Sequence, residues 1–375
     1  MNLEFSEEQA MMREMVRGVC AEFAPMDVVR ALEDDATGYP PDLWKQLAEL
    51  GLCGILIPEA QAGSGQSMLE AAIVGEQIGA ALAPSPWFVS AVLVARALLQ
   101  AGSAAQQTEW LPRIASGEAI FVPAWLEPRN GYGPRGVELR ATPDGDGFRL
   151  SGTKLHVHFA SAATRLLVLA RSGDGECDID LFLVDPHAPG VKLTQLYSLA
   201  SDTQYRVDLD QVRVAAVERI GAPGSGWATW DGVMLDGAIV AAAQAIGGAA
   251  RALDMTVNYA KERKQFDKPL GAFQAISHYL ADAATTVEGG QTLVYEAAWA
   301  RANGKPVERL APMAKLFACQ TYRDVTAMCQ QVWGGVGFTL EYDIQLYFRR
   351  AKQLQLSWWD GPTVEERIAH TILDD

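Results

Sequence analysis

The sequence lacks the features that mark secreted, membrane-spanning and nucleic-acid-binding proteins. No apolar run reaches the roughly 18 residues that cross a bilayer, so we expect no membrane span. The N-terminal sequence MNLEFSEEQAMMREM has no basic segment followed by an apolar one, so we expect no secretory signal. Asp and Glu (46) outnumber Lys and Arg (31), and the net charge of −15 argues against a nucleic-acid partner.

Cysteine is scarce, and its spacing excludes two further classes. The chain has five cysteines, and no two of them form a C-x-x-C pair, so neither a disulfide framework nor a zinc site is indicated. Together with the missing signal and membrane segment, this composition predicts a cytoplasmic protein. Because the chain is acidic, an anionic ligand needs a local basic patch, and residues 261–264 (KERK) and 349–352 (RRAK) offer two.

The hydrophobic pattern changes twice along the chain. With 375 residues and 49% hydrophobic content, the chain is long enough for two or three domains. It predicts an α+β protein with an N-terminal helical domain (residues 1–117), a middle antiparallel β domain (118–222) and a C-terminal helical bundle (223–375). The sequence GAPGSG at residues 221–226 predicts a linker, and small residues over 237–252 favour closely packed helices.

Local signals place several element ends. Ser6 is positioned to cap a first helix, because its hydroxyl can accept from the free amides of the first turn. Asp144-Gly145-Asp146-Gly147 predicts a β-hairpin turn. Short β-rich runs predict strands, and these runs are residues 120–122, 137–140, 148–150, 166–169 and 181–184.

The segment from Tyr259 to Asp282, YAKERKQFDKPLGAFQAISHYLAD, is the most informative part of the sequence. Pro269 interrupts the helical pattern and predicts the corner of a helix hairpin. Arg263, Phe266 and Gln274 gather around that corner, where a guanidinium, an aromatic ring and an amide can hold a planar anionic group. Taken singly, Arg263 could instead pair with a neighbouring acid and Phe266 could fill core.

The spacing R-x-Q-F-x-x-P-L-x-x-F-Q-A-I-x-H in this segment resembles the signature of the acyl-CoA dehydrogenase family. The resemblance covers nearly the whole chain and implies the family's fold, with a four-helix bundle as the C-terminal domain. It also implies FAD held between subunits, with Arg263, Phe266 and Gln274 reaching the cofactor of a neighbouring chain. A homo- or hetero-tetramer, built as a dimer of dimers, is the assembly expected from it.

A second segment, from Gln331 to Phe338 (QVWGGVGF), resembles the family's Q-x-x-G-G-x-G-[FY] sequence. The resemblance implies that Gln331, Gly334 and Gly335 lie at the adenosine end of FAD, since glycine lets the backbone approach a ligand closely. Alone, such a sequence is also typical of a helix C-cap and turn. The order and separation of the two segments strengthen the family resemblance.

Two other family motifs depart from the usual pattern. The T-E-P-x-x-G-S-D segment, which contacts flavin in the family, keeps only Glu127-Pro128 and Gly131. The K-x-W-[IV]-[TS] strand, which shields the flavin ring, reads Lys154-Leu155-His156-Val157-His158, so histidine replaces both the Trp and the hydroxyl residue. We expect His158 to lie near the flavin, and with no third ligand apparent we expect no metal site.

The candidate catalytic base is Asp360. Relatives carry a Glu in a Y-E-G-T sequence near the C-terminus, and this chain has Trp358-Trp359-Asp360-Gly361 there. The two Trp rings predict an apolar wall beside a carboxylate that removes an α-proton. Asp360 could instead cap the next helix. Some relatives carry the base on an earlier helix, where Asp236 is the nearest acid, and a third possibility is a chain without a base.

The resemblance implies dehydrogenation of an acyl-CoA thioester to the 2,3-enoyl-CoA, with the α-proton going to a carboxylate and the β-hydride to flavin. Electrons would then pass to an electron-transfer flavoprotein. One alternative is a catalytically incomplete subunit that completes the FAD site of a partner family member. Another is an oxygen-using oxidase or monooxygenase on the same fold. The Trp358-Trp359 pair and the altered motifs hint at a bulky substrate.

Overall fold

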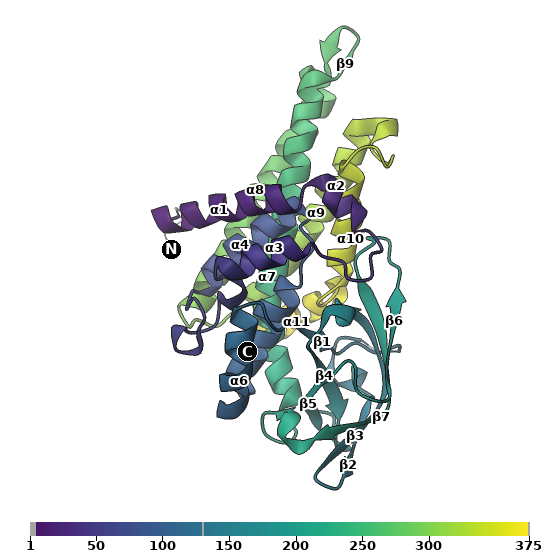
Figure 1. Ribbon diagram of the computed structural model, residues 1–375. Coiled ribbons are helices and arrows are strands. Elements are labelled where there is room, and N and C mark those ends of the chain that lie inside the picture. The colour runs from purple at the N-terminus through teal and green to yellow at the C-terminus, as the bar shows by residue number, and fades with distance from the viewer. Residues whose placement is uncertain (1–4, 130, 374–375) are drawn as a thin grey trace. The chain divides into compact units, whose positions relative to one another are not determined.

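Helices form both ends of the chain and strands form its middle (Figure 1). The computed structural model describes residues 5–129 and 131–373. The order of helical, β and helical parts confirms the predicted fold class. By their contacts the parts form two compact units: a helical unit from the described parts of Met1–Val29, Met68–Ala83 and Leu235–Asp375, and a mixed unit from Arg30–Ser67 and Pro84–Met234. The domain boundaries at residues 117 and 222 stay a prediction.

The helices begin and end where caps and prolines indicate. Ser6 Oγ accepts from the amide of Gln9 (3.2 Å) and the Gln9 side chain accepts from the Ser6 amide (3.0 Å), which confirms the cap expected at Ser6. The helices are α1 (Glu7–Phe23), α2 (Met26–Ala31), α3 (Pro41–Glu49), α4 (Met68–Ala81), the π-helical η3 (Phe88–Val94), α5 (Ala95–Ala101), α6 (Ala104–Ala115), α7 (Gly226–Glu262), α8 (Gln274–Ala302), α9 (Leu310–Trp333), α10 (Ile344–Leu356) and α11 (Gly361–Leu373).

Small residues bring α4 and α7 into close contact within the helical unit. A Cβ atom added at Gly79 would lie 2.1 Å from the carbonyl oxygen of Gln244, and one at Gly247 would lie 2.0 Å from that of Glu76. No side chain fits into such gaps, so the two backbones touch. This confirms the expectation that the Gly- and Ala-rich stretch serves close helix packing.

α7 has the length and hydropathy of a membrane-spanning helix, but it lies buried in the protein core. Among the described residues, α7 is long and apolar enough to cross a bilayer, with a mean hydropathy of 1.5 in its most apolar window. However, 89% of that window is buried inside the protein. A buried apolar helix of this length needs no lipid to cover it.

One sheet contains the strands of the mixed unit. Its order is β6-β7-β3-β2-β4-β5-β8, with β1 pairing to β4. The strands are β1 (Phe121–Ala124), β2 (Arg140–Asp144), β3 (Gly147–His158), β4 (Arg165–Arg171), β5 (Ile179–Val184), β6 (Val191–Leu196), β7 (Gln204–Ala215) and β8 (Arg219–Ile220). The hairpin predicted at Asp144–Gly147 joins β2 and β3, and Asp144 pairs with Gly147.

Two details of the β prediction are wrong. The sheet is mixed rather than antiparallel, because β1 pairs with β4 in parallel and β2 meets β4 in parallel at Arg140. The chain between β1 and β4 contains the β2–β3 hairpin, and such a long connection lets β4 return in the direction of β1. Most of the strand expected at 137–140 is also absent. The Glu127 carboxylate binds the amides of Glu138 and Leu139 (3.1 and 3.0 Å), so no neighbouring strand takes them.

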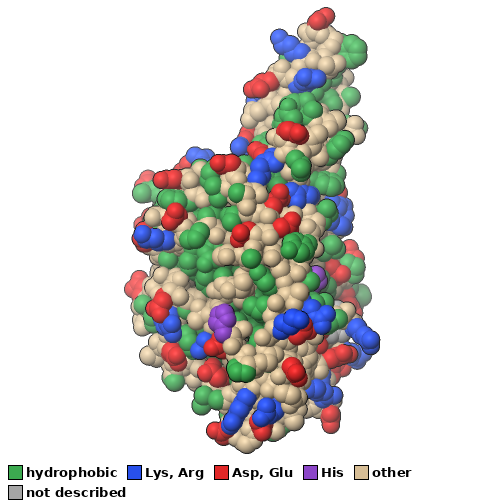
Figure 2. Space-filling view, turned by 45° about the vertical axis from the view of Figure 1, so that its right-hand side comes forward, with side chains coloured by type: hydrophobic (Ala, Val, Ile, Leu, Met, Phe, Trp, Pro, Cys, Tyr) green, Lys and Arg blue, Asp and Glu red, His purple; other side chains and the backbone are tan. Residues whose placement is uncertain are grey.

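A long helix hairpin projects from the helical unit (Figure 1). α7 and α8 form its two arms, and the short strands β9 (Lys264–Gln265) and β10 (Lys268–Pro269) pair at its tip. We call residues 261–274 the tip. Side chains at residues 261–268 are exposed, and Figure 2 shows charged groups of both signs and apolar groups on the visible face of the projection. The expected helix hairpin is confirmed, but the chain reverses at Phe266–Asp267, whereas Pro269 was predicted as the corner and lies after the turn, in β10.

Candidate functional site

The tip exposes all three residues that the hairpin motif singled out. Arg263 and Gln274 are exposed, and the Phe266 side chain is 87% exposed. The Phe266 ring meets Phe273 edge to face at 6.3 Å. The Phe266 ring is thus open to a ligand or to another chain.

The turn that carries Phe266 is strained. Phe266 and Asp267 have φ angles of 52° and 62°, the left-handed conformation that a two-residue hairpin turn requires. Asn-Gly is the usual sequence for such a turn, because a side chain crowds the following carbonyl in this conformation. Phe at the first position therefore adopts a conformation that it disfavours, and such strain is common at functional sites.

The second motif lies beside the last turns of α7. Tyr259 accepts from the amide of Arg263 (2.8 Å), and its ring stacks on Trp333 with centroids 4.1 Å apart and planes 10° from parallel. The indole of Trp333 donates to Thr256 Oγ1 (3.0 Å), and Gly334 follows directly. Contacts within one unit thus bring the two motifs together, which the sequence alone did not show.

The glycines of the second motif present open backbone. Gly334 has φ 65° and ψ −142°, a conformation essentially restricted to glycine. A Cβ atom added at Gly334 or Gly335 would meet nothing within 4 Å, and Gln331 is exposed beside them. Near the arms' outer end, α7 and α8 also enclose an open groove of about 530 Å³ lined mainly by small and apolar residues. The surface is thus accessible to a ligand that approaches backbone closely.

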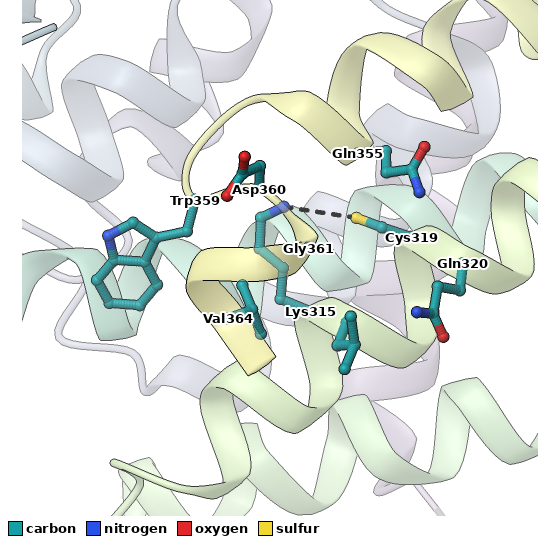
Figure 3. A pocket seen from close by; sticks show the side chains of 9 residues that line it. Lys315, Cys319, Gln320, Gln355, Trp359, Asp360, Gly361 and Val364 are labelled. Carbon is teal, nitrogen blue, oxygen red and sulfur yellow. Dashed lines mark hydrogen bonds between the residues drawn. The ribbon is translucent and has the colours of Figure 1, made fainter. Parts of the chain in front are cut away.

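Asp360 lies in the turn between α10 and α11 and caps the latter. Its Oδ1 accepts from the amide of Thr363 (3.1 Å), and its carbonyl accepts from the amide of Val364 (3.0 Å). It borders a cavity of about 10 Å³, room for roughly one water molecule. Figure 3 shows Lys315, Cys319 and Gly361 around the same cavity. The cap considered from the sequence is therefore present, and the role of Asp360 as base stays a prediction.

Two tryptophans with left-handed backbone conformation precede Asp360. Trp358 and Trp359 have φ angles of 56° and 73°, and both are buried, at 7% and 1% exposure. The guanidinium of Arg367 lies 4.0 Å from the ring centroid of Trp359. Bulky residues avoid this conformation, so packing of the two rings holds the turn in place.

The alternative base, Asp236, is committed to an ion pair. It is fully buried, and Arg301 donates to both of its carboxylate oxygens at 2.5 and 3.2 Å. A bidentate guanidinium stabilises the ionised carboxylate and occupies both oxygens. This arrangement suits a structural role better than proton abstraction.

In the mixed unit, the residues that survive from the two altered motifs form a buried pair. Lys154 Nζ donates to Glu127 Oε1 (2.6 Å) and lies 3.3 Å from the carbonyl oxygen of Trp125. Burial lowers the pKa of Lys154 to about 8, although the Glu127 carboxylate opposes the shift. Glu127 also holds the segment before β2. What this chain keeps of these motifs is thus the part that organises the sheet.

His158 lies next to a carboxylate that the sequence did not single out. Its Nδ1 is 3.3 Å from Asp202 Oδ2. A β-bulge between Lys154 and Val157 interrupts β3, and His156 there has φ 54°, so simple alternation does not orient the two histidines. In the described parts of the chain, no group of three His, Cys, Asp or Glu side chains could hold a metal ion.

Models of one protein family match the chain on both sides of the sheet. The model of the acyl-CoA dehydrogenase N-terminal domain matches residues 6–118, and that of the acyl-CoA dehydrogenase C-terminal domain matches residues 224–365. Together they cover more than half of the chain.

Individual proteins resemble the chain over nearly its full length. The probable acyl-CoA dehydrogenase YngJ of Bacillus subtilis is 33% identical over 378 residues, covering 98% of each chain. The caffeyl-CoA reductase-Etf complex subunit CarC of Acetobacterium woodii is 29% identical over 92% of this chain and 93% of its own. Among solved structures, the ChsE4-ChsE5 complex from Mycobacterium tuberculosis superposes with a TM-score of 0.91 at 27% identity, over 100% of both chains.

Proposed function

Because the chain belongs to the acyl-CoA dehydrogenase family, whose members are typically FAD-dependent oxidoreductases, we propose that it oxidises an acyl-CoA thioester to the 2,3-enoyl-CoA with FAD. The observation that carries this proposal is the tip, where Arg263, Phe266 and Gln274 are exposed together next to the open glycines of the second motif. Nothing in the hairpin's own packing requires a phenyl ring at its outermost turn.

The exposed side chains of the tip have the chemical groups that bind a flavin adenine dinucleotide. A guanidinium pairs with a pyrophosphate through two parallel hydrogen bonds, which makes Arg263 the candidate phosphate ligand. Phe266 offers a ring face, Gln274 an amide, and Gly334 and Gly335 offer backbone without side chains. Because these side chains point away from their own core, the FAD they serve is expected to be that of a neighbouring subunit, in a tetramer built as a dimer of dimers.

Bound FAD would supply a two-electron acceptor, and the chain must supply the base. Asp360 Oδ1 holds the amide of Thr363, while in the described part of the chain no hydrogen bond is made to Oδ2. One oxygen can thus fix the side chain while the other receives the α-proton of the thioester. The buried Trp358 and Trp359 keep the turn rigid around it.

A second candidate function is that of a subunit that completes a partner's FAD site without a base of its own. The resemblance to one solved complex of two different chains favours it. An electron-transfer flavoprotein as the acceptor is proposed from the likeness to CarC, a subunit of a complex with Etf.

An anaerobic titration of the purified protein with a panel of CoA thioesters tests these functions. The proposed enzyme is yellow as purified and its flavin absorbance bleaches with one class of thioester. A yellow protein that no thioester bleaches favours the incomplete subunit, and bleaching restored by a second family member would confirm that role. A colourless protein that takes up no FAD would contradict the homomeric enzyme. Rapid turnover in air without an added acceptor would instead indicate an oxidase.

A further inference from the structure

Lys315 of α9 is a buried lysine that binds the end of α10. It is 1% exposed, and lysine is almost never buried to this extent without a partner. Its Nζ donates to the carbonyl oxygen of Leu354 (3.1 Å) and lies 3.6 Å from Cys319 Sγ, one turn further along α9. Within residues 5–129 and 131–373, no carboxylate forms an ion pair with Lys315. The Leu354 carbonyl is therefore the main acceptor of this amino group.

The position of Leu354 in the chain explains this contact. α10 ends at Leu356, and the last carbonyl groups of a helix have no amide of a following turn to accept from. The amide of Ser357 donates to the carbonyl oxygen of Gln353 (3.0 Å), and Leu354 is the next carbonyl along the chain. A lysine beside the last carbonyls also lies at the negative end of the helix dipole. Lys315 therefore caps α10 from a neighbouring helix.

The turn that follows α10 depends on restraints from its surroundings. It runs from Ser357 to Asp360, and Trp358 and Trp359 within it have φ angles of 56° and 73°. Bulky residues persist in this conformation only where the surroundings impose it. At the far end of the turn, Asp360 is held by the helix that it caps. At the near end, the hydrogen bond from Lys315 holds the last residues of α10.

Packing between α9 and this turn is incomplete. The cavity of about 10 Å³ lies between them, lined by Lys315 and Cys319 on one side and by Asp360 and Gly361 on the other. Atoms that face a void lose their van der Waals contacts on that side. Figure 3 shows the Lys315 side chain extending from α9 toward the turn. The hydrogen bond to Leu354 is therefore a direct tie between α9 and the end of α10 where packing is loose.

We propose that Lys315 is a positioning residue for Asp360: by holding the Leu354 carbonyl it fixes the turn, and with it the carboxylate that receives the α-proton. The inference rests on the proposed function, in which Asp360 is the base, and adds the residue that places this base. A base acts only within reach of the proton that it removes, and a displacement of about 1 Å can slow a reaction about 100-fold. Lys315 should therefore affect the rate of proton removal and leave thioester binding unchanged.

Hydrogen exchange of the full-length protein tests the positioning without cofactor or substrate. Lys315→Met keeps an unbranched side chain of similar length but has no N–H to donate. The amides of Thr363 and Val364, which bind Asp360 (3.1 and 3.0 Å), should exchange about 5-fold faster, the effect of losing one hydrogen bond. The amide of Gln9, capped at the start of α1, should exchange at its wild-type rate. Unchanged exchange at Thr363 and Val364 would overturn the inference.

Anaerobic bleaching of the flavin at increasing thioester concentrations tests the effect on the reaction. In Lys315→Met the limiting rate should fall about 10–100-fold, while the concentration for half-saturation should not change. Lys315→Arg keeps a donor and should recover most of the rate. Gln320→Met changes another residue that lines the same cavity, and it should leave both values unchanged. If Lys315→Met does not fold, Lys315→Gln, whose amide ends one bond short of the amino group, replaces it in both experiments.

The outcomes separate this inference from the proposed function. If Asp360→Asn abolishes bleaching and Lys315→Met leaves the limiting rate unchanged, the inference fails and the proposed function stands. A higher half-saturating concentration in Lys315→Met with an unchanged limiting rate would also overturn the inference, because it would assign Lys315 to binding. If no thioester bleaches the wild type while exchange still responds to Lys315→Met, the proposed function fails, and Lys315 keeps only its part in holding the turn.

Discussion

Replacing Asp360 by Asn separates its role as a helix cap from its role as a base. Asn caps helices as well as Asp does, so Asp360→Asn keeps an oxygen for the amide of Thr363, 3.1 Å away in the wild type. What it loses is the negative charge near the N-terminus of α11, worth about 0.3–1 kcal/mol at an exposed site. The free energy of unfolding should therefore fall by less than about 1 kcal/mol.

The effect on chemistry should be far larger. An amide cannot accept the α-proton, and loss of a general base typically slows a reaction by about 10²–10⁴-fold. Asp360→Ala removes the base and the cap together, so it should lose the same activity and a further ~1 kcal/mol of stability. Two variants with equal loss of activity and different stability would show that the cap is not what catalysis needs.

The assay is anaerobic bleaching of the flavin by the best thioester, followed in a stopped-flow spectrometer, with urea unfolding of the same samples. Ser103→Ala is a matched control, because it removes the Ser103 cap of α6 (3.2 Å from the amide of Gln106) in the other unit. It should cost about 1 kcal/mol without slowing bleaching. A bleaching rate in Asp360→Asn within about tenfold of the wild type would refute Asp360 as the base.

Buried charge and backbone strain give three further tests. Lys154→Met leaves the Glu127 carboxylate buried without its ammonium partner, so the free energy of unfolding in urea should fall by about 3–5 kcal/mol. Adding Glu127→Gln should recover most of this loss. Additive losses in the double variant would contradict the pairing. Arg301→Met should lower the free energy of unfolding by a similar ~3–5 kcal/mol, because it leaves the buried Asp236 carboxylate without its partner. Arg301→Lys should restore only part of this stability, since an ammonium cannot bind both carboxylate oxygens in parallel. Full stability in the Lys variant would show that charge alone suffices. Phe266→Gly should raise the free energy of unfolding by about 1 kcal/mol, because glycine adopts φ 52° without strain. FAD binding, measured by fluorescence, should weaken in the same variant. Unchanged binding would exclude the Phe266 ring as a contact of FAD.

Sequence periodicity predicted the architecture because the signals were local. The cap at Ser6, the interruption of the helices near Pro269 and the turn at Gly145 each depend on one or two residues. β7 was missed although its sequence alternates, with Val207, Leu209, Val212 and Val214 all buried. That period-two pattern could have found it. The parallel pairing of β1 and β4 could not be found in this way, because it depends on where a distant strand returns.

The site was predicted only where motifs kept their spacing. Arg263, Phe266 and Gln274 lie within one hairpin, so their spacing alone placed them together at the tip. The contact between Tyr259 and Trp333 that joins the two motifs links residues on different helices, and no local signal reports it. Asp202 was missed for the same reason, since it reaches His158 only through the pairing of β3 with β7.

The departures from the family pattern are organised rather than random. Glu127 and Lys154, which this chain retains, form a buried pair that fixes the sheet. Of the histidines that replace the family's residues, His156 contacts Gln204 (2.7 Å) from a strained backbone with φ 54°, and His158 lies 3.3 Å from the Asp202 carboxylate. A subunit that had lost its ligand would have no reason to keep strain that costs about 1–3 kcal/mol at each such residue. The altered strand β3 therefore supports the proposal that this chain still binds a flavin ring.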